Sequence, residues 1–392
     1  MNKPLSLLMG GWLAWAAAAP AADEITIDRS IDVFGYKTVP VSISGFTGEA
    51  DEVIRFDLLF MGFETTTPDN ARYTIQGKNG GGRVEGIVYD TIAKQTKLAK
   101  AFSGGTTRMQ THALADEICL ALTGKPGIAQ TKIAFVGQPS GVGPGEIYVA
   151  DYDGRNAQAV TQDGVIVAAP CWGGRSQLFY TSYKFGKPDI FSHNLSTGAR
   201  RAVARFNGLN TSVAVSPDGQ RLAMILSKSG SPQVYVSALD GSNLKQLTTG
   251  KAVHASPCWS PDGRTICFVS DRSGTAALYT IPAEGGTPTR LPTTGVSRPT
   301  EPDWSPDGKN IIFTSQARDF SICIVPTEGP RRGQATVLVA GQDPVWAPNS
   351  RTVIFTRTVN NRHVLSLLDV PTRKFKDIAR ISGSASQASW VR

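Results

Sequence analysis

The segment Trp-Ser-Pro-Asp-Gly recurs along the second half of the chain, and its spacing constrains the fold more than any other feature. Complete copies begin at Trp259 and Trp304, and shorter copies surround four further positions. The equivalent positions lie 43, 44, 45, 42 and 44 residues apart, and they are Trp172, Val215, Trp259, Trp304, Trp346 and Trp390. A period of this length holds four short strands, which is the size of one β-propeller blade.

Each period can be divided into strands A to D. Strand A ends at the Trp, and a Ser-Pro-Asp-Gly turn leads into strand B, since Pro presets φ and Gly supplies the positive φ of a tight hairpin. Strand B alternates apolar residues, and six B strands are expected around Ile133, Leu178, Leu222, Ile266, Ile311 and Val353. The first B strand has no Trp-bearing strand before it, and Trp390 has no B strand after it. The C-terminal strand, about 385–391, is therefore predicted to close a six-bladed ring as strand A of the first blade, which leaves no free edge at the junction.

The aspartates of these turns have two interpretations. Asp262 and Asp307 could be catalytic groups or calcium ligands, or they could cap backbone amides within the turn. Because the residue recurs at the same place in several blades, we favour the turn role. The tryptophans at Trp259, Trp304 and Trp346 are predicted to be buried anchors between blades.

Residues 23–128 lack the repeat and are predicted to form a small α/β domain before a propeller over residues 129–392. Apolar residues at helical spacing predict helices over 49–61 and about 109–122, with Gly124 just after the second helix. Strands are expected over 38–44 and near 72–75, 84–89 and 97–102.

The first 22 residues have the pattern of a secretory signal peptide. One Lys precedes an apolar run of roughly 14 residues and small residues follow it, so cleavage is expected after Ala21 or Ala22. An uncleaved membrane anchor is the alternative. The next segment, 23–34, alternates like an exposed strand and is named here the N-terminal arm. Its candidate partner-binding residues are Asp23, Glu24, Ile25, Ile27, Asp28, Ile31 and Val33.

Charge, cysteine and histidine patterns exclude several classes of function. The formal charge is +8, but the basic residues are scattered, whereas a nucleic-acid platform would show a basic stripe with aromatics. The five cysteines include no CxxC pair, and the four histidines have no ligand spacing, so neither a metal nor a cofactor is expected. A disulfide between Cys258 and Cys267 across their hairpin stays open, although directly opposed strand residues are usually too far apart.

Catalytic motifs are also missing from the sequence. We find no nucleophile elbow, no P-loop and no dinucleotide fingerprint. A hydrolase that uses carboxylates such as Glu301 and Asp343, or a propeller that binds glycans or small ligands, is the alternative to a protein-binding role.

One junction is specific to a known family. The stretch from His112 to Val136 pairs an H-x-x-x-D-E helix, which ends in Leu-Thr-Gly, with a Thr-Lys-Ile-Ala-Phe-Val strand. Together with Tyr148-Val-Ala-Asp-Tyr-Asp-Gly and the repeats, it resembles the TolB family of periplasmic proteins of the Tol–Pal envelope system. The helix end at Asp57-Leu-Leu-Phe-Met-Gly-Phe departs from the family pattern, which indicates a divergent N-terminal domain.

The resemblance implies a periplasmic, non-enzymatic and monomeric scaffold that links inner-membrane Tol proteins to a peptidoglycan-associated lipoprotein, Pal, in envelope integrity and cell division. It implies that the arm engages TolA and that the propeller face opposite the Ser-Pro-Asp-Gly turns holds Pal. Loops between strands D and A form that rim, and its candidate residues are Lys251, His254, Ser256, Arg298, Thr300, Glu301, Gln342 and Asp343.

Overall fold

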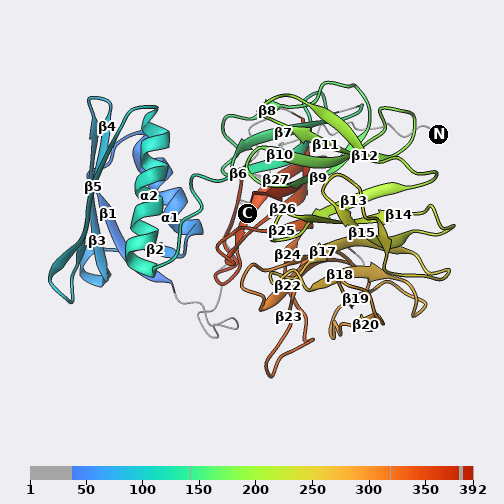
Figure 1. The fold of residues 1–392 in the computed structure, drawn as a ribbon. Helices are drawn as coiled ribbons and strands as arrows, with labels where there is room; N and C mark the ends of the chain where they lie inside the picture. Colours follow the sequence, from blue (N-terminus) through green and yellow to red (C-terminus); the bar gives the residue numbers. More distant parts are fainter. Residues whose placement is uncertain (1–37, 142, 318, 379–382, 392) are drawn as a thin grey trace, which may run out of the picture. The chain divides into compact units, whose positions relative to one another are not determined.

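A computed structural model describes residues 38–141, 143–317, 319–378 and 383–391. The predicted signal peptide and N-terminal arm lie outside these described residues. From Thr38 onward the chain belongs to one compact unit, in which a five-stranded α/β sheet precedes six four-stranded blades (Figure 1).

The α/β region has two helices on one face of its sheet (Figure 1). The helices are α1 (Glu49–Phe60) and α2 (Thr107–Thr123). The sheet has the order β2-β1-β3-β4-β5, and its strands are β1 (Val39–Ser44), β2 (Phe63–Thr65), β3 (Tyr73–Gly80), β4 (Arg83–Asp90) and β5 (Gln95–Ser103). Both predicted helices and four of these strands are confirmed, while β2 and the short 3-10 helix η1 (Pro68–Asn70) were not predicted.

Local sequence explains where the helices begin and end. Three acidic residues in the first turn of α1 favour its N-terminus because they complement the helix dipole. The Thr106 side chain caps α2 by accepting a hydrogen bond from the Met109 amide at 3.2 Å. Gly124 ends the helix in the left-handed region, at φ 71°, as its position after the apolar pattern predicted.

Each blade is a four-stranded antiparallel sheet. The first blade comprises β29 (Ser384–Trp390), β6 (Lys132–Gln138), β7 (Glu146–Asp151) and β8 (Gln158–Ala159); the second β9 (Val167–Trp172), β10 (Gln177–Ser182), β11 (Asp189–Asn194) and β12 (Arg200–Ala204); the third β13 (Asn210–Val215), β14 (Arg221–Leu226), β15 (Gln233–Ala238) and β16 (Lys245–Gln246). The fourth comprises β17 (His254–Trp259), β18 (Thr265–Ser270), β19 (Ala277–Pro282) and β20 (Thr289–Arg290); the fifth β21 (Pro299–Trp304), β22 (Asn310–Gln316), β23 (Phe320–Pro326) and β24 (Thr336–Ala340); the sixth β25 (Gln342–Trp346), β26 (Thr352–Val359), β27 (Arg362–Asp369) and β28 (Phe375–Asp377).

The C-terminal strand closes the ring as predicted. β29 pairs antiparallel with β6, and Trp390 lies opposite Ile133. The indole of Trp390 is 2% exposed, and its Nε1 donates to Thr131 Oγ1 at 2.8 Å. The first blade is therefore built from both ends of the repeat region, and no strand edge is left open at the junction.

The Ser-Pro-Asp-Gly aspartates serve their turns. The Ser260 hydroxyl donates to Asp262 Oδ1 at 2.6 Å and accepts from the Thr265 amide at 2.9 Å. The bond from the Ser260 hydroxyl, followed by that from the Arg264 amide, lowers the pKa of Asp262. Ser305 and Asp307 repeat the arrangement in the next blade. The structural interpretation of these residues is confirmed.

The blade tryptophans differ in burial. Trp259 and Trp346 are 4% and 1% exposed, and Trp259 Nε1 donates to the Ala214 carbonyl of the neighbouring blade at 3.1 Å. Trp304 is only half-buried, and its Nε1 bonds the Gly308 carbonyl of its own turn. Trp304 still packs against the apolar cluster between the fourth and fifth blades, so its predicted place between blades is confirmed and its full burial is not.

Cys258 and Cys267 face each other across β17 and β18, as their positions around the turn predicted. No disulfide joins the two thiols, and both are buried, so the pair contributes apolar packing between blades.

The α/β region and the ring share one hydrophobic core. The cluster that contains Ile54 and Leu58 of α1 also contains Ile354 and Leu367 of the sixth blade. Polar bonds add to it: Thr352 Oγ1 donates to the Phe60 carbonyl at 2.5 Å, and the buried Asp57 carboxylate accepts from Tyr152. The first and sixth blades are thus packed and hydrogen-bonded to α1.

Candidate functional site

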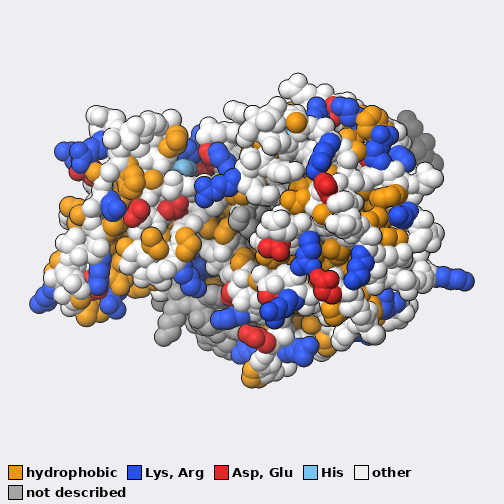
Figure 2. Space-filling view, in the orientation of Figure 1, with side chains coloured by type: hydrophobic (Ala, Val, Ile, Leu, Met, Phe, Trp, Pro, Cys, Tyr) orange, Lys and Arg blue, Asp and Glu red, His pale blue; other side chains and the backbone are white. Residues whose placement is uncertain are grey.

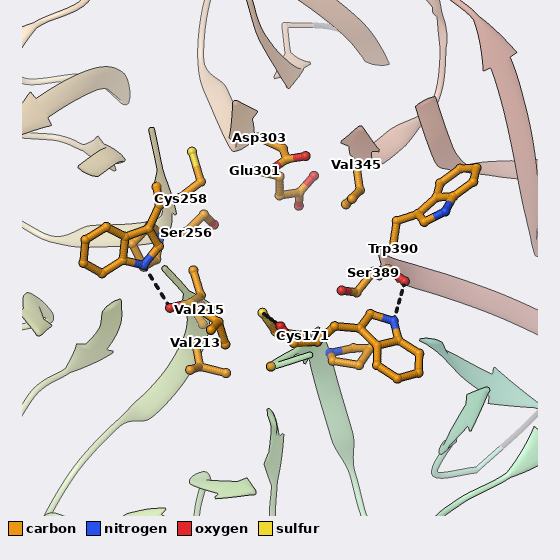
Figure 3. Close-up of a pocket in the computed structure, with 18 of the residues that line it drawn as sticks. Cys171, Val213, Val215, Ser256, Cys258, Glu301, Asp303, Val345, Ser389 and Trp390 are labelled. Atoms are coloured by element: carbon orange, nitrogen blue, oxygen red, sulfur yellow. Dashed lines mark hydrogen bonds between the residues drawn. The ribbon is translucent and has the colours of Figure 1, made fainter. Parts of the chain in front are cut away.

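A cavity of about 710 Å³ runs along the centre of the ring, and strand A of every blade contributes to its wall. Figure 3 shows Glu301 and Asp303 on one side of this channel and Cys171, Val213 and Ser389 on the other. The wall is fixed by bonds between blades, because Trp172 Nε1 donates to the Ser389 carbonyl at 3.2 Å.

One backbone position in every blade has the same unusual conformation. The third residue before each blade Trp, or before Val215, has a positive φ between 48° and 54°, although none is glycine; these residues are Ala169, Ser212, Ser256, Glu301, Asp343 and Gln387. Each lies at a β-bulge of strand A and lines the channel. Positive φ costs such residues of the order of 1–3 kcal/mol each. The bulge bends strand A at this position and places one ring of residues at the channel wall.

The channel wall is acidic. Among the described residues that line it, Asp218, Glu301, Asp303 and Asp343 are charged and none is basic. Glu301 Oε2 accepts bonds from Thr314 Oγ1 at 2.7 Å and from the Asp343 amide at 3.0 Å. Burial, and then the neighbouring Glu301 carboxylate, raise the pKa of Asp343 to about 7. A cationic or hydrogen-bond-donating group entering this side of the channel would therefore be favoured.

The predicted rim residues separate into two groups. Ser256, Glu301 and Asp343 line the cavity together. The others do not line it: Lys251 and Arg298 are exposed in the loops before β17 and β21, whereas Thr300 and Gln342 are half-buried within their strands.

His254 departs from the rim prediction. It is 1% exposed, its ring packs edge-on to Phe268 at 5.2 Å between centroids, and Arg272 Nη2 lies 3.4 Å from its Nε2. Burial, followed by the Arg272 charge, lowers the pKa of His254 to about 4. The side chain is a neutral part of the blade interior, because the first residue of strand A already faces the neighbouring strands and not solvent.

Four apolar side chains that the sequence analysis missed are exposed on the rim face. They are Ile166, Phe185, Val253 and Phe320, with exposed fractions of 57%, 51%, 47% and 49%. All lie in loops between strands D and A or B and C, or directly beside them. In an antiparallel blade these two kinds of loop meet at the same end. No periodic signal marks them, although the six channel residues could have been found by counting three positions back from each repeat position.

Two other findings limit the chemistry. Within the part of the chain that the structure describes, no group of three or more His, Cys, Asp or Glu side chains is placed to hold a metal ion. The described helices include none that is both long and apolar enough to cross a bilayer.

Comparison with known proteins agrees with this architecture. The family model described as the TolB beta propeller domain matches residues 120–392. The Tol-Pal system protein TolB of Anaeromyxobacter dehalogenans strain 2CP-C is 33% identical over 276 residues, which covers 59% of this chain and 63% of the relative. The protein of the same name from Bordetella pertussis is 32% identical over 317 residues, which covers 61% and 71%.

Among solved structures, TolB from Acinetobacter baumannii aligns with a TM-score of 0.78 at 23% identity, over 91% of this chain and 96% of that one. This likeness concerns the fold. The chain spans about three fifths of the length of the first curated relatives that it matches. Because the family model covers more than half of the chain, including the whole ring of blades, the chain belongs to the TolB β-propeller family.

Proposed function

We propose that the chain is a periplasmic protein-binding scaffold of the Tol–Pal system, which links inner-membrane Tol proteins to a Pal-like lipoprotein during envelope maintenance and cell division. The curated relatives that it resembles carry the name Tol-Pal system protein. The observation that carries the proposal is the rim face, where apolar side chains are exposed in or beside the loops that join strands D to A and B to C.

The rim face has the composition of a protein interface. Apolar and aromatic side chains of several blades are exposed at this end of the ring, and such residues supply most of the affinity when a partner excludes water from them. Lys251 and Arg298 are exposed at the same end. The opposite face has turns whose side chains are engaged within the turn, such as Ser260 with Asp262. The rim thus suits contact with a Pal-like protein.

Charge reversal separates the two faces. The variant Lys251→Glu/Arg298→Glu changes two exposed loop residues, so we expect its melting temperature to stay within about 2 °C and its affinity for a purified Pal-like lipoprotein to fall tenfold or more. The matched control, Arg264→Glu/Lys309→Glu, makes the same charge change on the turn face and should bind normally. If the rim variant binds normally and the control loses binding, the partner binds the turn face and the proposal is wrong.

The N-terminal arm is proposed as the site for a TolA-like protein. Its alternation of Ile and Val with acidic residues suits pairing with a partner's sheet edge. Removal of residues 23–34 should eliminate TolA binding and leave the melting transition nearly unchanged. Retained TolA binding would locate that site elsewhere.

The proposed role is non-enzymatic, and turnover assays distinguish it from the hydrolase alternative. The purified chain is incubated with glycosides, esters and peptides, and so is an Asp343→Asn variant. We expect the parent to hydrolyse none of these substrates faster than the variant does. Turnover that disappears in this variant would favour a carboxylate hydrolase.

A further inference from the structure

Strand β5 is a long free edge of the α/β sheet. It is the last strand in the sheet order, spans nine residues without proline, and its side chains are mostly exposed. Its backbone pairs with β4 on one side, and no described strand pairs with the other. The opposite edge, β2, has three residues. Of the two edges, β5 therefore presents the longer row of unpaired backbone donors and acceptors.

Exposed apolar side chains flank this edge on both faces of the sheet. On the face away from the helices, Ile87 and Tyr89 are 49% and 38% exposed, and Ile87 lies opposite Ala99 of β5. On the helix face, Met109 and Leu120 of α2 are 59% and 47% exposed. Figure 2 shows hydrophobic patches among basic side chains over this region, at the left.

The exposed side of α2 faces β5. Glu117 lies on it and pairs with Lys100 of β5 at 3.7 Å. Since successive helix residues are rotated by about 100° around the helix axis, Met109, Leu120 and Glu117 lie within roughly 80° of one another around that axis. A strand added beside β5 would point alternate side chains to the two faces. One set would cover Met109 and Leu120, and the other would extend the surface of Ile87 and Ala99.

The charges beside the edge are positive. Lys94 and Lys97 are exposed and form no ion pair among the described residues. Nearby, Glu117 and Glu85 are already paired with Lys100 and Arg83. A second copy of the chain would bring these lysines toward each other, which is unfavourable. An acidic strand would instead gain opposite-charge pairs.

We propose that β5 accepts an extended acidic segment of a partner polypeptide as the sixth strand of this sheet. The unpaired backbone edge selects a polypeptide, the lysines select acidic residues, and the apolar side chains on both faces select an alternating sequence. The site is separate from the rim and from the arm, so its test is independent of the proposed function.

The probe is a fluorescein-labelled ten-residue peptide of alternating Val and Glu, titrated against the full chain with anisotropy as the readout. We expect saturable binding, loss of binding when alternate amides of the peptide are N-methylated, and no binding by a Val-Lys peptide. The variant Lys94→Glu/Lys97→Glu should bind about tenfold or more weakly, whereas Arg264→Glu/Lys309→Glu should bind within about twofold of the parent. Hydrogen exchange should slow in β5 when the peptide binds.

Three results would overturn the proposal. They are the absence of saturable binding, equal binding of the N-methylated peptide, and exchange protection outside the α/β region with none in β5. Phosphatidylglycerol vesicles test whether this basic and apolar patch binds a membrane surface instead of a peptide. If they bind through Lys94 and Lys97 and the peptide does not, the patch is a membrane contact and the added strand is excluded.

Discussion

The blade tryptophans occupy the same position in the repeat but differ in their surroundings. Trp259 and Trp346 are almost fully buried, while Trp304 is only partly buried. We expect Trp259→Ala and Trp346→Ala to lower the free energy of unfolding by roughly 3–5 kcal/mol each, the range for large core truncations. Trp304→Ala should cost less, about 1–2 kcal/mol. Guanidinium denaturation of the three variants checks this order. If Trp304→Ala lowers the free energy of unfolding as much as the other two, burial does not determine the size of the loss.

Asp343 makes stability depend on pH in a direction that its burial sets. Its pKa is raised from 3.8 to about 7 in the folded chain, so between these values the folded state binds more protons than the unfolded state. The protonated Asp343 therefore contributes to the free energy of unfolding at low pH, and this contribution is lost as the pH rises through the window. Asp343→Asn, whose side chain tolerates positive φ, should flatten the decline between about pH 4 and 7 by on the order of 1–3 kcal/mol. Urea midpoints at matched pH values measure the difference, and parallel profiles would contradict it.

At the scale of elements, the closing strand β29 holds the two ends of the propeller together. It supplies strand A of the first blade and brings Trp390 against Thr131. Deletion of residues 385–392 should expose β6 as an open edge and lower the melting temperature by roughly 10 °C or more, since several kcal/mol of packing is lost. Removal of Arg392 alone is the control. A truncated chain that melts like the parent would mean that another strand completes the blade.

At the scale of the whole molecule, the common core of α1 and the sixth blade couples the α/β region to the ring. Thr352 and Asn349 of that blade both donate to the Phe60 carbonyl at the end of α1. We therefore expect a single calorimetric transition for the full chain. Asp57→Ala removes the acceptor of both His112 and Tyr152, and should lower stability by about 3–5 kcal/mol because buried partners lose their charge-assisted bonds. Two separate transitions in the parent would show that the regions unfold independently.

The period of the repeat by itself determined most of the architecture. Four strands per period, six blades, the turn role of Asp262 and closure by the C-terminal strand follow from spacing and turn chemistry, which act over a few residues. The opposition of Cys258 and Cys267 follows in the same way, since a hairpin turn sets its own register.

Burial and convergence were decided only by the tertiary structure. His254 was predicted on the rim but is buried, while Ser256, two residues later, lines the channel. Trp304 shares its repeat position with Trp259 and yet is only partly buried. The physical reason is that a repeat sets a residue's place within its own blade, whereas its exposure depends on neighbours that are about 40 residues or more distant in the chain. Bulges at Ser256, Glu301 and Asp343 bring side chains of three blades to one channel wall, and the raised pKa of Asp343 exists only because the fold buries it beside Glu301.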